Sequence, residues 1–303
     1  MDKIRVEQLS KQYGPHKVLD NISFAIPSGK ITVILGKNGA GKTTLIKILL
    51  NMIQGDTGNV YYDNQNIQQL GQHFYYSVSA ILETVDNVYT FMTGKQNIEY
   101  FLGISQLKKC YRDEDVQRLI RELEMEHAMD NPAGSYSRGM KQKLALIIAL
   151  MTDAEIHFFD EPTLGLDFKS TKTLCAKIKA LSFEQGKTII LTSHQVDVIQ
   201  ELADYVIVLD HGQIIFSDTY ANFLTYNQPT GVYYAVLNVA PTKIIASEGI
   251  SVEAEQNAVR LVAVDRQKLV AYLTTHQLWE QVMHLSSSAT QQTIEEILEL
   301  LYS

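Results

Sequence analysis

The sequence predicts an α/β fold that is followed by a small α+β unit, and three observations lead to this prediction. An apolar segment at 31–35 runs into a glycine-rich loop and then into a segment with helical spacing at 42–52. Apolar strands and amphipathic helices alternate from 156 onward. The pattern changes after about 226. Alternation of strands and helices predicts a mostly parallel sheet that helices cover on both faces.

The first half of the chain opens with short strands and continues with helices. Alternating apolar residues predict one strand around 4–9 and another at 18–26, separated by a turn at Gly14-Pro15. From about 97 to 151 the apolar spacing becomes helical. One amphipathic stripe in this range consists of Val116, Leu119, Ile120 and Leu123.

The second half alternates strand and helix until the pattern changes. We predict a strand at 156–159, a helix at 169–181, a strand at 188–192, a helix at 195–202 and, on either side of a turn at His211-Gly212, strands at 205–209 and 213–216. After a linker at 227–231, we predict strands at 232–239, 258–264 and 281–286 and helices at 266–276 and 291–301. These elements indicate a large domain at 1–225, helical at about 85–150, and a small accessory domain at 226–303.

The composition narrows the class of partner. With 303 residues, of which 46% are hydrophobic, the chain can bury a large core. Its formal net charge of -8 argues against nucleic acid as the main partner, because phosphate backbones bind basic surfaces. Cys110 and Cys175 are far apart and form no CxxC pair. We therefore expect neither a disulfide framework nor a zinc site, and a reducing cytosol fits.

No part of the sequence predicts a membrane span. The most apolar run, 144–151, is shorter than the roughly 18 to 20 residues that a helix needs to cross a bilayer. The segment at 1–7 is polar and mixed in charge, unlike a signal peptide. If this protein acts at a membrane, we expect another chain to span it.

The glycine-rich loop carries the strongest chemical signal. Its residues, Gly36-Lys37-Asn38-Gly39-Ala40-Gly41-Lys42-Thr43-Thr44, fit the phosphate-loop pattern GxxxxGK[ST] in full. The glycines let backbone N–H groups converge on a phosphate, and the following helix points its positive end at the anion. Lys42 is expected to neutralise the β- and γ-phosphates of ATP, and Thr43 to offer its hydroxyl to Mg²⁺.

Asp160 and Glu161 form the second signal. They follow the apolar strand at 156–159, so we expect them at the carboxyl edge of the sheet, where α/β folds bind ligands. An Asp-Glu pair in this position is otherwise commonly a helix cap. Behind a phosphate loop, Asp160 is predicted to hold Mg²⁺ through water and Glu161 to act as the general base on the attacking water.

In these motifs, residues 1–220 resemble the nucleotide-binding domains of ATP-binding-cassette (ABC) proteins. The family's signature segment, usually LSGGQ, matches Ser135-Tyr136-Ser137-Arg138-Gly139-Met140-Lys141-Gln142. Asp167 ends a match to the loop that links the two nucleotide sites of the family. His194 matches the switch histidine that contacts the γ-phosphate, and Tyr13 matches the aromatic residue that stacks on adenine. The resemblance implies a phosphate-loop NTPase fold with an antiparallel β subdomain and a helical subdomain.

The resemblance also implies that two copies of the chain sandwich two ATP molecules. Ser137 and Gly139 lie at the start of a predicted helix, whose N-terminus presents free N–H groups to an anion. In the family this end meets the ATP that the opposite subunit binds, so Ser137, Arg138 and Gly139 are assigned to nucleotide binding across the dimer. ATP then favours the closed dimer, and hydrolysis releases it.

Three residues depart from the family pattern, and one of them, Met140, stands in place of the usual Gln of the signature, a change similar to what occurs in drug and lipid exporters. Glu83 stands where a Gln usually contacts Mg²⁺ and faces the membrane subunit, and it adds a negative charge. This change is similar to what occurs in exporters that protect bacteria from peptide antibiotics such as bacitracin and lantibiotics. Arg138 replaces the first glycine of the usual pair in the signature. His157, inside the strand before Asp160, is interpreted as structural.

Together these features imply an ATP-hydrolysing subunit of an exporter of peptide antibiotics, drugs or lipids. The chain would be cytoplasmic and peripheral to the membrane, where a separately encoded permease would place a helix in a groove around 83–97. The alternative is a soluble ABC-type ATPase that acts on ribosomes or DNA, but this chain has neither a second cassette nor a long coiled-coil insertion. Glu161 and His194 argue against an inactive cassette. The C-terminal unit is either a dimerisation or regulatory module or a passive appendage.

Overall fold

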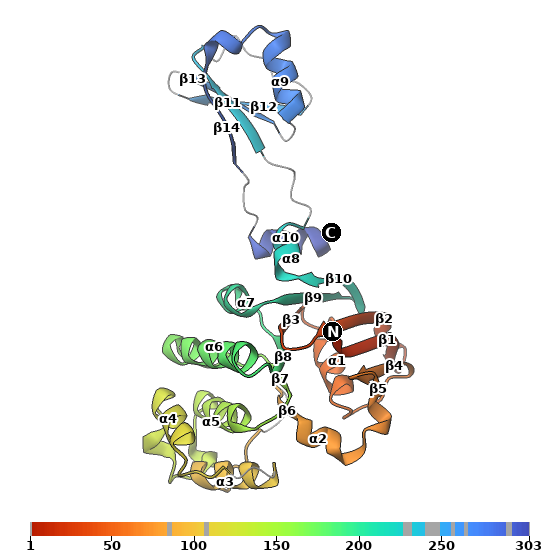
Figure 1. Cartoon of the computed structure of the whole chain (residues 1–303), viewed down its shortest axis with the longest axis vertical. Coiled ribbons are helices and arrows are strands. Elements are labelled where there is room, and N and C mark those ends of the chain that lie inside the picture. The colour runs from red at the N-terminus through yellow and green to blue at the C-terminus, as the bar shows by residue number, and fades with distance from the viewer. Residues whose placement is uncertain are drawn as a thin grey trace. The chain divides into compact units, whose positions relative to one another are not determined.

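The computed structural model of this chain describes residues 2–83, 87–105, 109–226, 232–239, 249–255, 258–263, 266–288 and 293–302 (Figure 1). The chain forms two compact units, Met1–Ala221 and Asn222–Ser303.

A six-stranded sheet forms the centre of the first unit, in the order β10-β9-β3-β8-β7-β6. Its strands are β3 (Ile31–Leu35), β6 (Val78–Ile81), β7 (Ile156–Asp160), β8 (Thr188–Thr192), β9 (Tyr205–Asp210) and β10 (Gln213–Thr219). Neighbouring strands are parallel except for β9 and β10, which are antiparallel. Strands β3, β7 and β8 are buried along their whole length, which explains why their sequences are nearly continuous apolar runs.

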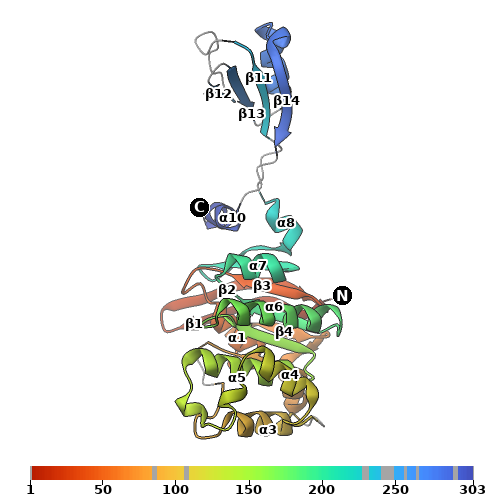
Figure 2. The same cartoon turned by 90° about the vertical axis from the view of Figure 1, so that its left-hand side faces the viewer.

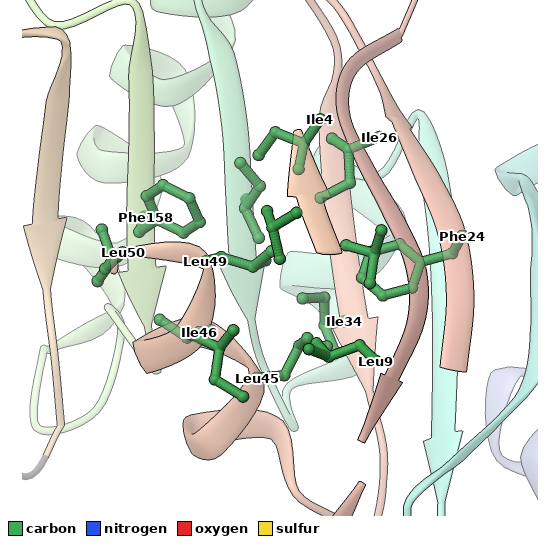
Figure 3. Packing of buried hydrophobic residues seen from close by; sticks show 14 of the residues in the cluster. Ile4, Leu9, Phe24, Ile26, Ile34, Leu45, Ile46, Leu49, Leu50 and Phe158 are labelled. Carbon is green, nitrogen blue, oxygen red and sulfur yellow. The ribbon is translucent and has the colours of Figure 1, made fainter. Parts of the chain in front are cut away.

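An antiparallel sheet in the order β2-β1-β4-β5 packs against one side of this centre. Its strands are β1 (Asp2–Tyr13), β2 (His16–Pro27), β4 (Thr57–Tyr62) and β5 (Gln65–Asn66). Helix α1 (Lys42–Leu49) lies between the two sheets (Figure 1). One hydrophobic core joins all three, as Figure 3 shows for Ile4, Leu9, Phe24, Ile26, Ile34, Leu45, Ile46, Leu49, Leu50 and Phe158.

Another group of helices covers the other face of the central sheet (Figure 1). These are α5 (Arg138–Met151), α6 (Phe168–Phe183) and α7 (Val196–Leu202), while α3 (Gly94–Ile104) and α4 (Glu114–Glu122) pack on α5 (Figure 2). The short helices are α2 (Phe74–Ser77) and α8 (Tyr220–Leu224), with 3₁₀ turns at Ile67–Gln69, Gly71–His73, Glu126–Ala128, Ala133–Ser135 and Trp279–Gln281. Among the described helices, none has the length and apolar character of a membrane span.

Helices α1 and α3 each differ at one end from the sequence-based expectation, for a reason that the structure shows. Helix α1 ends at Leu49 rather than at residue 52, because Asn51 adopts a left-handed φ of 54°. The Met52 N–H then bonds to the Lys47 carbonyl oxygen at 2.9 Å, a pattern that closes helix ends. Helix α3 begins at Gly94, earlier than the expected 97, because Thr93 and Gln96 form a reciprocal capping box.

The second unit contains an antiparallel sheet with the strand order β12-β13-β11-β14. Its strands are β11 (Val232–Leu237), β12 (Ile250–Glu255), β13 (Ala258–Ala263) and β14 (Val282–Ser288), and its helices are α9 (Arg266–Thr275) and α10 (Ile294–Tyr302). Helix α9 packs on β11 and β13 over a core that includes Leu237, Leu261 and Leu273. The predicted α/β fold with a C-terminal α+β unit is confirmed. Strand β12 was not expected, and the linker predicted at 227–231 lies outside the described residues.

Candidate active site

The phosphate loop joins β3 to α1 and requires glycine at several positions. Gly39 and Gly41 have φ angles of 84° and 108°, in the left-handed region that favours glycine. A Cβ atom on Gly36 would lie 2.4 Å from the carbonyl oxygen of Leu209, so the loop passes directly against β9. The Lys42 ammonium donates to the Gly36 carbonyl oxygen at 2.6 Å, which keeps the charge inside the curve of the loop.

The start of α1 is left open for an anion. Gly41 is the N-cap of α1, and no side chain caps the first turn, which contains Lys42, Thr43 and Thr44. The first N–H groups of a helix have no partner within the helix, and they carry partial positive charge. Together with the loop residues Asn38 and Gly39, this turn has the geometry of a phosphate cradle.

Two oxygen-bearing side chains meet between the loop and β7. Thr43 Oγ1 donates to Asp160 Oδ2 at 3.3 Å, and Asp160 is only 2% exposed. Within the described parts of the chain, no group of three or more His, Cys, Asp or Glu side chains is arranged to hold a metal by itself. Mg²⁺ commonly binds one or two protein oxygens together with substrate phosphates. Thr43 and Asp160 therefore fit Mg²⁺ held between protein and nucleotide.

Glu161 has an unusual backbone conformation directly after β7. Its φ of 52° lies in a region that few residues other than glycine adopt. The side chain is 12% exposed, and this burial raises the pKa of Glu161, an effect that Lys42 partly opposes. A raised pKa brings the carboxylate closer to neutral pH, where a general base transfers protons efficiently.

His194 lies beside Glu161. Its Nε2 is 3.3 Å from Glu161 Oε1. Burial lowers the pKa of His194, and the positive charge of Lys42 lowers it further, so the imidazole is neutral at physiological pH. The structure thus brings Lys42, Asp160, Glu161 and His194 together at the carboxyl edge of the central sheet.

Glu83 and Arg138, two of the residues that depart from the family pattern, face each other. Arg138 Nη2 lies 3.9 Å from Glu83 Oε1. Both residues line a pocket of about 160 Å³ together with Asp160 and Glu161. Burial lowers the pKa of Lys42 and raises that of Glu161, and the charge of Glu83 adds a smaller upward contribution to both pKa values, so this charge is part of the site. The additional negative charge at this position therefore has a cation next to it.

The signature segment begins α5. Ser137 caps this helix, and its Oγ accepts from the Met140 N–H at 3.2 Å. The Arg138 side chain is 71% exposed. A Cβ atom on Gly139 would lie 2.5 Å from the carbonyl oxygen of Gly165, so only glycine allows this close approach. The start of α5 therefore packs directly on the loop that follows Glu161 in the same chain.

Three side chains that the sequence reasoning missed hold these segments together. Gln142 Nε2 donates to the Pro162 carbonyl oxygen at 3.0 Å, and Lys143 Nζ lies 3.0 Å from Asp167 Oδ2. Thr192 Oγ1 forms hydrogen bonds with Asp160, the last residue of β7, and with Glu161, which follows it. A polar residue that ends the apolar strand at 188–192 was the signal for Thr192. Gln142 ends the signature segment, but neither it nor Lys143 carried a signal for these contacts, because the helical pattern does not say which loop packs on α5.

The two remaining predicted residues take part in local structure. Asp167 caps α6, accepting from the Ser170 N–H at 2.8 Å, and this bond and Lys143 lower the pKa of Asp167. Tyr13 ends β1 with 50% of its surface exposed, and Lys11 Nζ lies 5.5 Å from its ring centre. An exposed ring can stack on a base, but that role of Tyr13 stays a prediction.

The sequence that contains this site is similar to the sequences of known proteins. Residues 19–164 match the family model described as "ABC transporter". The chain is 32% identical to the ABC transporter ATP-binding protein NatA of Bacillus subtilis, over 66% of this chain and 81% of that protein. It is 32% identical to the bacitracin transport ATP-binding protein BcrA of Enterococcus faecalis, over 70% of this chain and 68% of that protein. It is 30% identical to the methionine import ATP-binding protein MetN of Chlamydia pneumoniae, over 70% of this chain and 64% of that protein.

A solved structure shares the fold. The dimeric structure of MJ0796, described as a bacterial ABC transporter cassette, superposes with a TM-score of 0.64. The match covers 71% of this chain and 98% of that one at 23% identity. The match supports the architecture of the first unit.

Proposed function

This chain belongs to the ABC transporter family, whose members hydrolyse ATP, and from that premise we propose that it powers an exporter of peptide antibiotics, drugs or lipids. A separately encoded transmembrane permease would carry the cargo, and the chain would reach the inner face of the cell membrane by binding that permease. The observation that carries ATP hydrolysis by this chain is the meeting of Glu161 with His194 at 3.3 Å beside Lys42 and the phosphate loop.

The binding step uses the loop and its lysine. The N–H groups of the loop and of the first turn of α1 would hold the phosphates of ATP. The Lys42 ammonium, now bonded to the Gly36 carbonyl oxygen, would turn toward the β- and γ-phosphates. Mg²⁺, when bound at Thr43 and Asp160, would neutralise charge on the phosphate oxygens.

The hydrolytic step uses Glu161 and His194. Glu161 would orient the attacking water and accept its proton as the new P–O bond forms. The bond between the γ-phosphorus and the bridging oxygen breaks, which leaves ADP and phosphate. Since His194 is neutral, its imidazole can donate from one nitrogen and accept at the other, and the short distance to Glu161 allows both groups to contact the reacting atoms.

We further propose that two copies of the chain close over two ATP molecules. Ser137, Arg138 and Gly139 at the start of α5 would contact the γ-phosphate that the other copy binds. The high exposure of Arg138 supports this, because its guanidinium is available to a second molecule. The cassette that shares the fold is described as dimeric.

The export direction and the cargo class rest on Glu83. Glutamate at this position resembles the antibiotic exporters, and one relative is named for bacitracin transport. Another relative is named for methionine import, so membership in the family leaves the direction open. The names of these relatives refer to transport and contain no reference to ribosomes or DNA.

An exposed apolar surface supports the docking of a permease helix. We call it the aromatic surface, and it consists of Tyr75, Tyr76, Tyr89, Phe91, Tyr100 and Ile104, each at least 39% exposed. The ring of Tyr89 contacts those of Phe91 and Tyr100. Tyr100 and Ile104 lie one turn apart on α3, and Ile104 shares a groove with Tyr75 and Tyr76. Exposed apolar patches of this kind mark protein interfaces.

The hydrolytic assignment is tested with Glu161→Gln. We expect this variant to bind ATP as the wild type does, to lose at least about 100-fold in turnover, and to elute as a dimer in ATP on gel filtration. Retained turnover would remove Glu161 from the role of base. A variant that stays monomeric in ATP would count against the sandwich of two copies.

The permease assignment is tested by co-purification from detergent-solubilised membranes of the native organism. We expect wild-type chain to recover a polytopic membrane protein and Phe91→Glu to lose it. Phe183→Glu is the matched control, because Phe183 is 92% exposed on α6 and is not part of the aromatic surface. Equal recovery with both variants would exclude the aromatic surface as the docking site. Recovery of ribosomes or repair proteins alone would overturn the transporter proposal.

A further inference from the structure

Thr192 is a fully buried polar residue at the end of β8. Its exposure is 0%, and it lies in a parallel register between Asp160 of β7 and Ile34 of β3. The two strands on its sides are those that lead into the acidic pair and into the phosphate loop. His194 follows two residues later in the chain.

One hydroxyl group of Thr192 connects both members of the acidic pair. Oγ1 donates to Asp160 Oδ1 at 2.8 Å, and it accepts from the Glu161 N–H at 2.9 Å. A hydroxyl has one proton to donate, and here that proton goes to Asp160. The second oxygen of Asp160 is left to face Thr43.

Each of these two hydrogen bonds stabilises a group that would otherwise be unfavourable in the folded chain. Asp160 is 2% exposed, and a buried carboxylate is costly unless hydrogen bonds replace water. Glu161 has a φ of 52°, a conformation that persists only where the surroundings hold it. The bond from its N–H to Thr192 holds the backbone in that conformation, which in turn sets the direction of its side chain toward His194.

We propose that Thr192 is a positioning residue for ATP hydrolysis, whose hydroxyl fixes the carboxylate of Asp160 and the backbone of Glu161 relative to each other. This inference rests on the proposed hydrolytic role of the site. Among the described residues, the Thr192 hydroxyl forms hydrogen bonds with Asp160 and Glu161 and with neither the phosphate loop nor the Lys42 ammonium. It therefore acts on the chemical step through Asp160 and Glu161. Its loss should therefore lower kcat while nucleotide binding in the absence of metal is kept.

Two pairs of variants separate the hydroxyl from the shape of the side chain. Thr192→Val keeps the branched shape and replaces the hydroxyl with a methyl group. Thr192→Ser and Thr192→Ala both lose the methyl group and differ from each other only in the oxygen atom. Thr32→Val is the matched control on β3, because Thr32 is also 0% exposed and its Oγ1 has no hydrogen-bond partner among the described residues.

We expect kcat to fall about 10- to 100-fold in Thr192→Val and Thr192→Ala, the size expected when one buried hydrogen-bonding group is lost. Thr192→Ser and Thr32→Val should stay within about threefold of wild type. Binding of a fluorescent ATP analogue in EDTA should be unchanged in all four. In ATP and Mg²⁺, Thr192→Val should persist as a dimer on gel filtration, as is expected of Glu161→Gln, because hydrolysis is slow.

Several results would overturn the inference. Wild-type turnover in Thr192→Val and Thr192→Ala would do so, and so would an equal loss in Thr192→Ser and Thr192→Ala, which would assign the effect to packing. If Thr192→Val does not fold, as thermal unfolding would show, the pair Thr192→Ser and Thr192→Ala decides alone. If Glu161→Gln keeps its turnover, the proposed function fails first. If Glu161→Gln loses its turnover as expected and Thr192→Ala keeps it, only the inference about Thr192 is wrong.

Discussion

At the scale of the residue, His157 shows how one buried side chain limits the pH range of the fold. Its exposure is 0%, and its ring stacks on Phe159 in the centre of the sheet. Burial, helped by Lys187, lowers the pKa of His157 to about 4. The neutral ring is therefore the form that the folded chain contains near pH 7, which agrees with a structural role for His157.

This shift makes a prediction about acid stability. In the unfolded chain a histidine has a pKa of about 6.5, so protonation favours the unfolded state between about pH 6.5 and 4. The contribution of His157 is complete above that range and falls as the pH drops through it. From pH 7 to pH 5 we expect the free energy of unfolding to fall by about 2 kcal/mol from this residue alone. Denaturant titrations of wild type and of His157→Asn, which cannot titrate, measure the difference, and parallel pH curves would refute the prediction.

Lys42 gives a second prediction at this scale. Its ammonium lies inside the phosphate loop, where it donates to the Gly36 carbonyl oxygen at 2.6 Å. Charge-assisted hydrogen bonds contribute about 1.5 to 3 kcal/mol, so Lys42→Ala should weaken ATP binding by about 10-fold or more. Lys47→Ala, later in the same helix, should bind like wild type. Isothermal titration compares the two, and equal affinities would undermine the assignment of the phosphate loop.

At the scale of the element, α6 offers a test of how the loop after Glu161 is anchored. Asp167 caps this helix through the Ser170 N–H and pairs with Lys143 of α5. Asp167→Ala removes the cap and should cost about 1 kcal/mol in the free energy of unfolding. Asp167→Asn keeps an equally good cap and should cost less than half of that. Thermal unfolding distinguishes them, and an equal loss would assign the effect to the pair with Lys143.

The elements also show what could be predicted from the sequence and why the rest could not. The buried strands β3, β7 and β8 were predicted because a strand covered on both faces has to be apolar throughout. Strand β4 was not, because its first three residues are exposed and only the antiparallel pairing with β1 organises it. Strand β12 likewise depends on β13. Where a strand depends mainly on the strand that it pairs with, the pattern of its own residues does not predict it.

The same limit applies to the candidate site. The phosphate loop and the acidic pair were found because each is contiguous in sequence and follows an apolar strand. Thr192, Gln142 and Lys143 act through contacts between segments that the sequence does not bring together. The register of β7 against β8 places Thr192 beside Asp160, and that register is a property of the folded sheet.

At the scale of the whole molecule, the two units have separate hydrophobic cores. The core around α1 contains residues of the first unit, and the core under α9 contains residues of the second. The chain has one tryptophan, Trp279, which lies in the second unit, 44% exposed and bonded to Thr274 Oγ1. Its fluorescence therefore reports on the second unit, while far-ultraviolet circular dichroism reports on both.

We expect these two signals to respond differently to nucleotide. At an ATP concentration of 100 times Kd, a bound unit gains about 2.7 kcal/mol, which raises its Tm by roughly 5 to 10 °C. The part of the circular dichroism change that comes from the first unit should shift by that amount, and the tryptophan transition should not. Glu161→Gln avoids hydrolysis during the measurement. Coincident transitions with equal shifts would show that the units unfold as one.

The contact between Glu83 and Arg138 has a consequence for anyone who builds chimaeras of these cassettes. The segments that carry the two residues lie far apart in the sequence, yet each supplies the charge that the other faces. A graft that moves the 135–142 segment from a relative with glycine at this position would leave an acidic group in the pocket without its counterpart. Segment exchange in this chain should therefore treat 83 and 138 as a single module, transplanted together or not at all.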